Sequence, residues 1–381
     1  MVMIGSTSAA MATQQPNPIL APRAETILFQ TESDFDNCFL QGIEYNPTDE
    51  GFRLTKTSEN NYVSSGTITS PILHAKFKAN NLVTSWNTIL PLGTAIKIEL
   101  QVLGKKFFIS KWSPWYEMGI FGDKQFDKND KIKKGFFGKV EEDELKLQSG
   151  TKTFRYRITL YTADPAISPT LHLFGVCYAD MKHRIPVVDT LLPDTTHPSD
   201  WTRDLPVPYR SQLVEDKSIS WRACHPTSLS MVLEYYGTKL PTAEVASCVW
   251  DSWSEIYGNW SFNAAFAGSL GYRSWIIRCS SFDPIKQEIA AGHPVILSIA
   301  FKRGVLSNAP IRSTAGHIIV CRGFTPEGDP ICNDPAAKTE DKGHVVYKLQ
   351  ELERAWLAQK AAAVIVHPKE VKSKIQNPNS K

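Results

Sequence analysis

The stretch SWRACHPTSLSMVLEYYG, residues 220–237, places a cysteine where a helix is expected to begin. Apolar residues from Leu229 to Tyr236 are spaced for one helical face, and Gly237 suits the end of a helix. The first N–H groups of a helix are unpaired and carry partial positive charge, so a thiol placed there loses its proton more easily. The pattern therefore predicts a helix that presents Cys224 as a nucleophilic thiolate.

A cysteine nucleophile needs a base, and the sequence offers one histidine in a suitable setting. His317 follows Gly316 in STAGHIIVCRGF, where a glycine permits close approach and the next strand would hold the imidazole rigidly. A third group must fix the tautomer of that imidazole. Asp334, in GDPICNDPAA at the end of the next expected strand, is our candidate, and Asn333 is the less favoured one.

Acyl transfer also requires hydrogen-bond donors for a developing oxyanion. The backbone N–H of Cys224 is one candidate donor, and the side-chain amide of Gln212 in VPYRSQ is the other.

Taken in order, the blocks VPYRSQ, CHPTSLSMVLEYYG, GHIIVCRGF and NDPAA resemble the papain-like C39 family of cysteine peptidases, specifically its stand-alone bacterial members. The resemblance spans roughly residues 205–366, and four ordered blocks are far more specific than one motif. It implies that Cys224 is the nucleophile, His317 the base, Asp334 the orienting residue and Gln212 the oxyanion donor.

One position departs from the family pattern. The family usually has glycine after the nucleophile, whereas this chain has His225. An imidazole pointing along the cleft would narrow it, change the substrate or reduce activity. We expect Trp221, His225 and Gly316 to line the substrate groove.

Three alternatives compete with this interpretation of the cysteine. A lone helical cysteine is often a small core residue. A metal site made of Cys224, His225, His317 and Cys321 has suitable ligand types but no short paired spacing. His225 could itself act as the base. We expect no metal and no cofactor, and packing roles for four other cysteines: Cys248, Cys279, Cys321 and Cys332.

The first half of the chain has a different texture. Residues 45–180 alternate β-branched and aromatic runs with turn residues, a pattern typical of an antiparallel β-sandwich. LVTSWNTILPLGTAIKIELQV and KWSPWYEMG are similar to the β-sandwich that precedes the peptidase unit in some of these bacterial proteins. Aromatic residues there could stack on a glycan or another cell-surface ligand, or could instead fill the interior between two sheets: Trp86, Trp112, Trp115 and Tyr116.

The second half predicts helices first and mostly antiparallel strands afterwards, as in an α+β domain. Helices are expected over 224–236, 240–250, 259–271, 283–292 and 349–359, and strands over 293–301, 316–324, 329–334, 344–349 and 361–367. The fold class is therefore multidomain, an N-terminal antiparallel β-sandwich plus a C-terminal α+β papain-like cysteine peptidase domain.

Composition shifts predict the domain boundaries. The predicted segments are a disordered tail or signal remnant (1–25), the β-sandwich (26–182), a proline-rich connector that could also be a buried strap (183–204), the peptidase domain (205–368) and a C-terminal tail (369–381).

Charge and hydropathy limit the partners. A formal net charge of +3 is too small to indicate nucleic acid, and no apolar run reaches the length of a membrane span. Ala10-Met11-Ala12 has the pattern of a signal cleavage site without an apolar region before it, so we expect a secreted or cell-surface protein, with the cytoplasm as the alternative.

These observations predict a peptidase that acts on a peptide or protein through a thioester. A thiol acyltransferase or amidase with the same triad remains open, as does an inactive scaffold whose β-sandwich binds a glycan or a protein. Substrate specificity and oligomeric state stay open.

Overall fold

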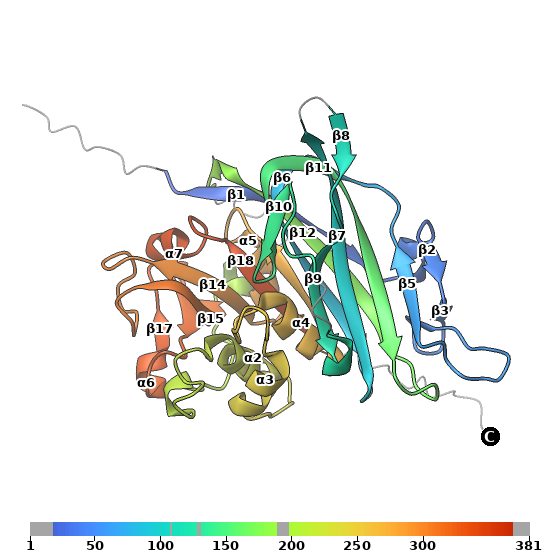
Figure 1. The fold of residues 1–381 in the computed structure, drawn as a ribbon. Helices are drawn as coiled ribbons and strands as arrows, with labels where there is room; N and C mark the ends of the chain where they lie inside the picture. The colour runs from blue at the N-terminus through green and yellow to red at the C-terminus, as the bar shows by residue number, and fades with distance from the viewer. Residues whose placement is uncertain (1–17, 107–108, 128–130, 189–197, 369–381) are drawn as a thin grey trace, which may run out of the picture.

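A computed structural model describes residues 18–106, 109–127, 131–188 and 198–368 (Figure 1). A part built almost entirely of strands is followed by a part in which helices lie beside a six-stranded sheet. The predicted order of a mostly-β domain and a domain of helices and strands is confirmed, whereas the sandwich and papain-like details stay predictions.

The described residues of the N-terminal domain form twelve strands, which antiparallel ladders join into one network. They are β1 (Leu20–Phe29), β2 (Phe39–Gln41), β3 (Ile43–Asn46), β4 (Gly51–Leu54), β5 (Ser65–Thr69), β6 (Leu73–Ile89), β7 (Thr94–Lys106), β8 (Ile109–Trp112), β9 (Tyr116–Gly122), β10 (Gly138–Glu141), β11 (Glu144–Thr162) and β12 (Thr170–Pro186). Two 3-10 turns, η1 (Glu32–Phe35) and η2 (Lys124–Phe126), connect some of them.

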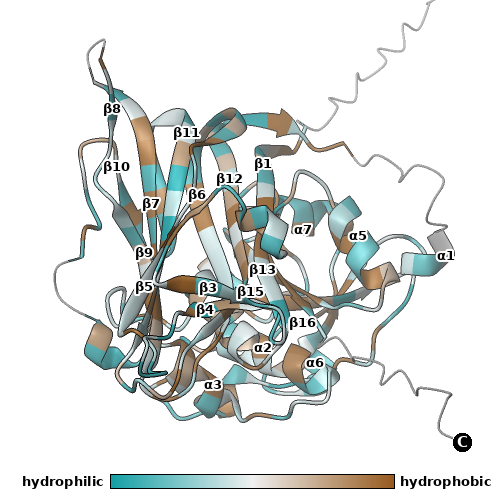
Figure 2. Ribbon diagram, turned by 90° about the vertical axis from the view of Figure 1, so that its right-hand side faces the viewer, coloured by the Kyte–Doolittle hydropathy of each residue, from teal (hydrophilic) through white to brown (hydrophobic). Residues whose placement is uncertain are grey.

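The long strand β11 changes its neighbours along its length. Its first half pairs with β6, and its second half, from Phe154, pairs with β7 and then also with β5. Hydrophilic and hydrophobic bands alternate along β7 and β11 (Figure 2), as expected for strands with one buried face. Strand β11 therefore joins β6 to β5 and β7 within one network.

The aromatic residues considered for glycan stacking do not form one exposed platform. Trp86 and Tyr116 are fully buried, so for these two the interior alternative is correct. The Arg155 guanidinium lies 4.8 Å from the Trp112 ring centre and 5.1 Å from that of Trp115. Arginine therefore already occupies ring faces that a sugar would need.

In the C-terminal domain most helices precede the main strands, as predicted, whereas α6 and α7 lie between the later strands. The helices and the 3-10 turn are α1 (Pro198–Trp201), η3 (Gln212–Val214), α2 (Cys224–Tyr235), α3 (Thr242–Val249), α4 (Trp260–Ser269), α5 (Asp283–Ala290), α6 (Glu340–Gly343) and α7 (Leu349–Ala355). The antiparallel sheet has the order β13 (Arg273–Arg278), β18 (Ala362–His367), β14 (Val295–Phe301), β15 (Thr314–Phe324), β16 (Pro330–Asn333) and β17 (His344–Val346). Strand β13 was not predicted.

Helix α4 and strand β13 pack the two domains together. A side chain at Gly268 would lie 2.6 Å from the Asn87 backbone, so glycine allows α4 to approach β6. The Asn87 amide pairs with the Ser274 backbone, donating to its carbonyl (2.7 Å) and accepting from its N–H (2.9 Å). Because the contact is buried, these two hydrogen bonds fix how β6 and β13 lie against each other at the domain interface.

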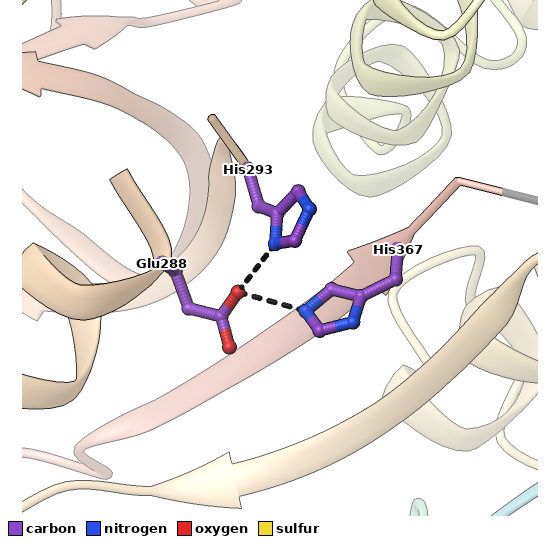
Figure 3. Close-up of side chains that lie close together, drawn as sticks. All are labelled: Glu288, His293 and His367. Atoms are coloured by element: carbon purple, nitrogen blue, oxygen red, sulfur yellow. Dashed lines mark hydrogen bonds and ion pairs between the residues drawn. The ribbon is translucent and has the colours of Figure 1, made fainter. Parts of the chain in front are cut away.

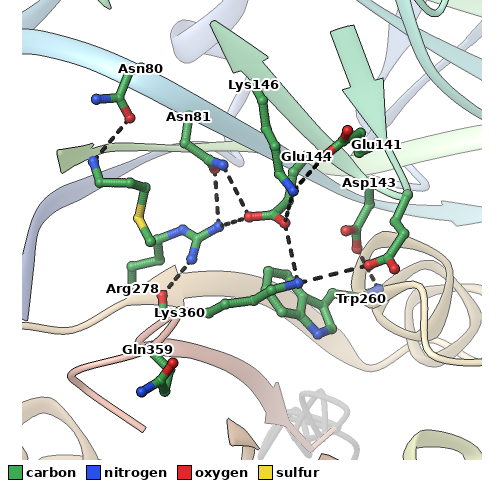
Figure 4. A network of polar contacts seen from close by, with 12 residues as sticks. Asn80, Asn81, Glu141, Asp143, Glu144, Lys146, Trp260, Arg278, Gln359 and Lys360 are labelled. Atoms are coloured by element: carbon green, nitrogen blue, oxygen red, sulfur yellow. Dashed lines mark hydrogen bonds and ion pairs between the residues drawn. The ribbon is translucent and has the colours of Figure 1, made fainter. Parts of the chain in front are cut away.

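A buried charge network continues this interface (Figure 4). Arg278 of β13 donates to Glu144 of β11 (2.6 Å) and to Asn81 of β6 (3.0 Å). Lys360, from the segment before β18, lies 3.2 Å from the same glutamate. The Arg278–Glu144 pair thus neutralises charges from both domains in the buried contact, and Lys360 adds a partly exposed charge beside it.

The segments between and outside the domains are described in part. Strand β1 begins at Leu20, and β12 runs to Pro186. Val187 packs on the core, Val188 is exposed, and Leu191 and Leu192 lie outside the described residues. Among the described helices, none has the length and apolar character needed to cross a membrane.

Candidate active site

Cys224 is the first residue of α2, as predicted. The preceding Ala223 offers no side-chain cap, and its carbonyl accepts the first helical bond, from Thr227 N–H (2.9 Å). The thiol is half-buried, and no disulfide involves it. The unpaired N–H groups at the N-terminus of α2 therefore lie near the sulfur and favour negative charge there.

His317 and Asp334 form a buried pair beside this thiol. His317 lies on β15, and Asp334 directly follows the neighbouring strand β16. His317 Nε2 donates to Asp334 Oδ1 over 2.7 Å, and the Cys224 thiol is hydrogen-bonded to the same imidazole. Because Nε2 is engaged by the carboxylate, Nδ1 is the nitrogen that faces sulfur.

Electrostatics favours a charged imidazole here. Burial by itself disfavours the charged form of His317, but the Asp334 carboxylate and the Cys224 contact outweigh it and raise the pKa of His317 to about 10. Burial likewise opposes ionisation of Asp334, and the histidine charge together with hydrogen bonds still lowers the pKa of that carboxyl. A proton released by the thiol would thus be retained by the imidazole.

Asp334 is held on several sides. Tyr347 donates its hydroxyl to Oδ2 (2.8 Å), and the Ala336 N–H donates to Oδ1 (2.9 Å). The alternative residue Asn333 points elsewhere, donating its amide to the Val207 carbonyl (3.1 Å). Asp334, not Asn333, therefore contacts the histidine.

Helix α2 is anchored to β15 one turn after the thiol. The buried Ser228 hydroxyl donates to the carbonyl of Ile318, the residue after His317, over 3.2 Å. This bond sets the depth of the helix relative to the strand, and with it the separation of sulfur and imidazole.

The thiol and imidazole open into a cavity of about 340 Å³. Its lining includes Gly316 and Trp221, whose side chain is largely exposed, and their contact with a substrate stays a prediction. A side chain at Gly316 would meet nothing within 4 Å, so the space above this glycine is open to another backbone. The site is accessible to a bulky substrate.

Gln212 lies near the base of α2 but outside the described lining of this cavity. Its side-chain Nε2 donates to the Ser220 carbonyl (2.8 Å), and its buried Oε1 has no partner among the described residues. In this conformation the amide braces the loop before Cys224. Its oxyanion role stays a prediction.

His225 differs from the expectation that it points along the cleft. It is fully buried, its Nδ1 lies 3.3 Å from the Gly258 carbonyl, and burial lowers its pKa to about 4. The side chain after the nucleophile turns into the protein because the helix places successive residues about 100° apart. A neutral, enclosed imidazole neither narrows the cleft nor serves as its base.

The proposed sulfur and histidine ligands do not converge on a metal. Among the described residues, only one group of three potential ligands lies within 4.8 Å, and it does not include Cys224. Cys279, Cys321 and Cys332 are buried as expected, whereas Cys248 is exposed, which corrects its predicted packing role.

Family models match both halves of the chain. Residues 204–364 match the model described as Peptidase_C39 like family, and residues 27–179 match that described as Peptidase C39 N-terminal domain. The chain belongs to the C39-like peptidase family. No curated protein matches it.

Several solved structures resemble parts of this C39-like protein. A C39-like peptidase from Bacillus anthracis is 17% identical, with 43% of this chain and 97% of that chain covered and a TM-score of 0.33. A double glycine motif protease from an AMS/PCAT transporter, in complex with the leader peptide, is 22% identical, with 43% and 94% covered and a TM-score of 0.30. The galactotriose complex of TmCBM61 is 8% identical, with 40% and 86% covered and a TM-score of 0.20.

Sequence reasoning missed three residues around the C39-like site. Tyr347, the residue after β17, donates a hydrogen bond to Asp334. Glu142 and Lys360 line the cavity. Glu142 comes from the N-terminal domain, at the turn between β10 and β11, where its φ is 56°. No local motif marks such residues, because only tertiary packing brings them to the cleft.

Proposed function

We propose that this protein is a cysteine peptidase that hydrolyses peptide or isopeptide bonds through a Cys224–His317–Asp334 triad. The observation that carries the proposal is the convergence of three features at one site. These are a thiol at a helix N-terminus, an imidazole bonded to it, and a carboxylate on the imidazole's other nitrogen. No cofactor is required for this chemistry.

The first half of the reaction forms a thioester. The Cys224 proton passes to His317 Nδ1, and the thiolate attacks the substrate carbonyl carbon. The tetrahedral intermediate collapses when the imidazolium protonates the leaving amine, so the C–N bond breaks and the C–S bond remains. Asp334 keeps Nε2–H oriented throughout.

The second half regenerates the thiol. Water loses a proton to the neutral His317 as its oxygen attacks the thioester, and that proton returns to sulfur when the C–S bond breaks. The Cys224 N–H would stabilise the oxyanion in both halves, and the second N–H of the Gln212 amide would assist once the side chain turns from Ser220.

Alkylation kinetics test the activated thiol directly. We expect the pH profile of Cys224 alkylation by iodoacetamide to differ between the wild type and His317→Ala, with faster alkylation at neutral pH in the wild type because the imidazole takes up the thiol proton. Peptide mass spectrometry follows each thiol separately, and the exposed Cys248 provides an internal reference in the same sample.

An unchanged Cys224 profile in His317→Ala would refute the thiolate–imidazolium pair and favour the inactive scaffold. If the pair is present, product analysis of a cleaved peptide with and without added amine distinguishes hydrolysis from acyl transfer. A free carboxylate product in both samples supports the peptidase, and an amide product supports the transferase.

A further inference from the structure

Glu288, His293 and His367 form a second cluster of functional side chains (Figure 3). Hydrogen bonds from Tyr235 and Tyr236 place it at the end of α2 opposite to Cys224. Glu288 lies on α5, His293 follows that helix, and His367 ends β18. His293 Nδ1 lies 3.0 Å and His367 Nε2 lies 2.8 Å from the same carboxylate oxygen, Oε2. We propose that these three residues bind a divalent transition-metal ion of the zinc type.

The directions of the three groups carry the proposal. Both ring nitrogens point at one carboxylate oxygen, so in the other tautomer of each ring their lone pairs converge on the same place. Tetrahedral zinc with ligands at about 2.1 Å separates them by about 3.4 Å. The two contacts to Oε2 would thus need to widen by about half an ångström, and the three ligand atoms already lie within 4.8 Å of one another.

The ligand set is appropriate for such an ion. Two neutral imidazoles and one carboxylate are typical of zinc and related metals, with water completing the coordination. The three side chains keep 21%, 19% and 24% of their surface exposed, in the order His293, Glu288, His367. An ion can therefore enter, and a position remains open to water.

The backbone on both sides of the cluster is already fixed. At the end of α2, Tyr235 donates its hydroxyl to the carbonyl of Gly292, next to His293 (3.0 Å). Tyr236 donates to the carbonyl of Val366, next to His367 (2.9 Å). Two adjacent tyrosines thus position the two histidine-bearing segments, so little ordering remains when metal binds.

The structural consequence is a clamp remote from the thiol. With 12 residues, α2 is about 18 Å long, so the ion would not reach the reacting groups. It would tie the end of β18 to α5 and, through the tyrosines, to the last turn of α2. We expect the ion to stabilise the fold without taking part in the reaction.

Metal titration of the full chain tests this assignment. A Cys224→Ala background without a polyhistidine tag removes the competing thiolate and the competing imidazoles of a tag. After chelator treatment, we expect one equivalent of Zn²⁺ to bind and to raise the melting temperature by several degrees. Co²⁺ should bind with an absorption spectrum that lacks a thiolate-to-cobalt band.

Substitutions in the same background locate the ion. We expect His293→Gln and His367→Gln each to weaken Zn²⁺ at least tenfold. His344→Gln is the matched control, since His344 is also partly exposed and paired with a carboxylate, Asp204, at 3.3 Å. The Zn²⁺ affinity of His344→Gln should equal that of the parent.

If circular dichroism shows that the histidine variants do not fold, the titration uses Glu288→Gln instead, which preserves the size of the side chain and one hydrogen-bond acceptor. Absence of stoichiometric binding, or parental affinity in the cluster variants, would overturn the proposal and leave a hydrogen-bonded structural cluster.

Discussion

At the scale of single residues, the site depends on groups to which the motif blocks assign no role. Ser228 and Tyr347 each donate one hydrogen bond, the first to the strand that carries His317 and the second to Asp334. Neither touches the thiol. Both act as positioning residues, since they fix the distance and orientation of groups that would do the chemistry.

Tyr347→Phe should separate positioning from packing. Loss of the hydroxyl leaves Asp334 Oδ2 short of one donor, so we expect kcat/KM on a peptide substrate to fall about tenfold, mostly through kcat. The fold should lose about 1 kcal/mol. Tyr235→Phe, which removes a comparable hydroxyl bond to Gly292, is the control and should lose stability but keep activity.

Equal losses of kcat in both variants would mean that the effect is general destabilisation. A pH profile of kcat/KM adds a second readout, because only the Asp334 partner should change its shape.

At the scale of elements, helix α4 depends on the other domain. Asp143, from the turn before β11, accepts hydrogen bonds from the backbone N–H groups of Trp260 and Ser261 (3.1 Å for Ser261). The N-terminus of α4 is thereby capped by a residue more than a hundred positions earlier. Burial first, and then the nearby Glu144, raise the pKa of Asp143 to about 7.

This cap predicts an unusual pH dependence of stability. Folding raises the pKa of Asp143 from 3.8 to about 7, so the folded state binds a proton that the unfolded state has lost between these values. The contribution of Asp143 to the stability of the fold therefore falls as pH rises from about 4 to 7. Asp143→Asn keeps an acceptor for the cap, and we expect its melting temperature to decline less across this window.

The control is Asp143→Ala, which removes the acceptor and should be less stable at every pH. Parallel curves for Asp143→Asn and the wild type would contradict the assignment.

Most elements were predictable because their patterns are local. The helix beginning at Cys224 and the strand carrying His317 could be predicted from periodicity and turn residues alone. Strand β13 could not, because its buried face carries Ser274 and Arg278 beside Ile276. These polar residues are buried only because partners distant in the sequence satisfy them, such as Glu144 for Arg278 and the Ile365 carbonyl for Ser274, so the alternation of polar and apolar residues gives no strand signal.

For the same reason, only some residues of the candidate site could be predicted from the sequence. Cys224, His317 and Asp334 were identified because each lies in a recognisable block, and the structure brings them together. The direction of His225 and the contribution of Glu142 depend on how helices and domains pack. No spacing within the chain reports that packing.

At the scale of the whole molecule, one core runs through both domains, and the Glu144–Arg278 pair lies within their contact. Burial opposes ionisation of Glu144, but Arg278 foremost among its neighbours lowers its pKa to about 2. This group therefore stabilises the fold above about pH 4.5, and the contribution is lost as pH falls toward 2. The domains should unfold together near neutral pH.

Glu144→Gln tests this coupling. It leaves Arg278 buried without its counter-ion, and we expect a loss of about 3–5 kcal/mol in the free energy of unfolding, measured by denaturant titration. Glu141→Gln, on the exposed side of the same hairpin, should cost less than about 1 kcal/mol. Similar small losses in both would show that the interface does not couple the domains.

The hairpin turn that carries Glu142 into the cavity has a consequence for inheritance. A recombination event that separated the coding regions of the two domains would remove part of the cavity wall and the cap of α4 together. The peptidase half would survive such an event only with compensating changes on the newly exposed face. Selection should therefore pass the two halves on as a single heritable unit.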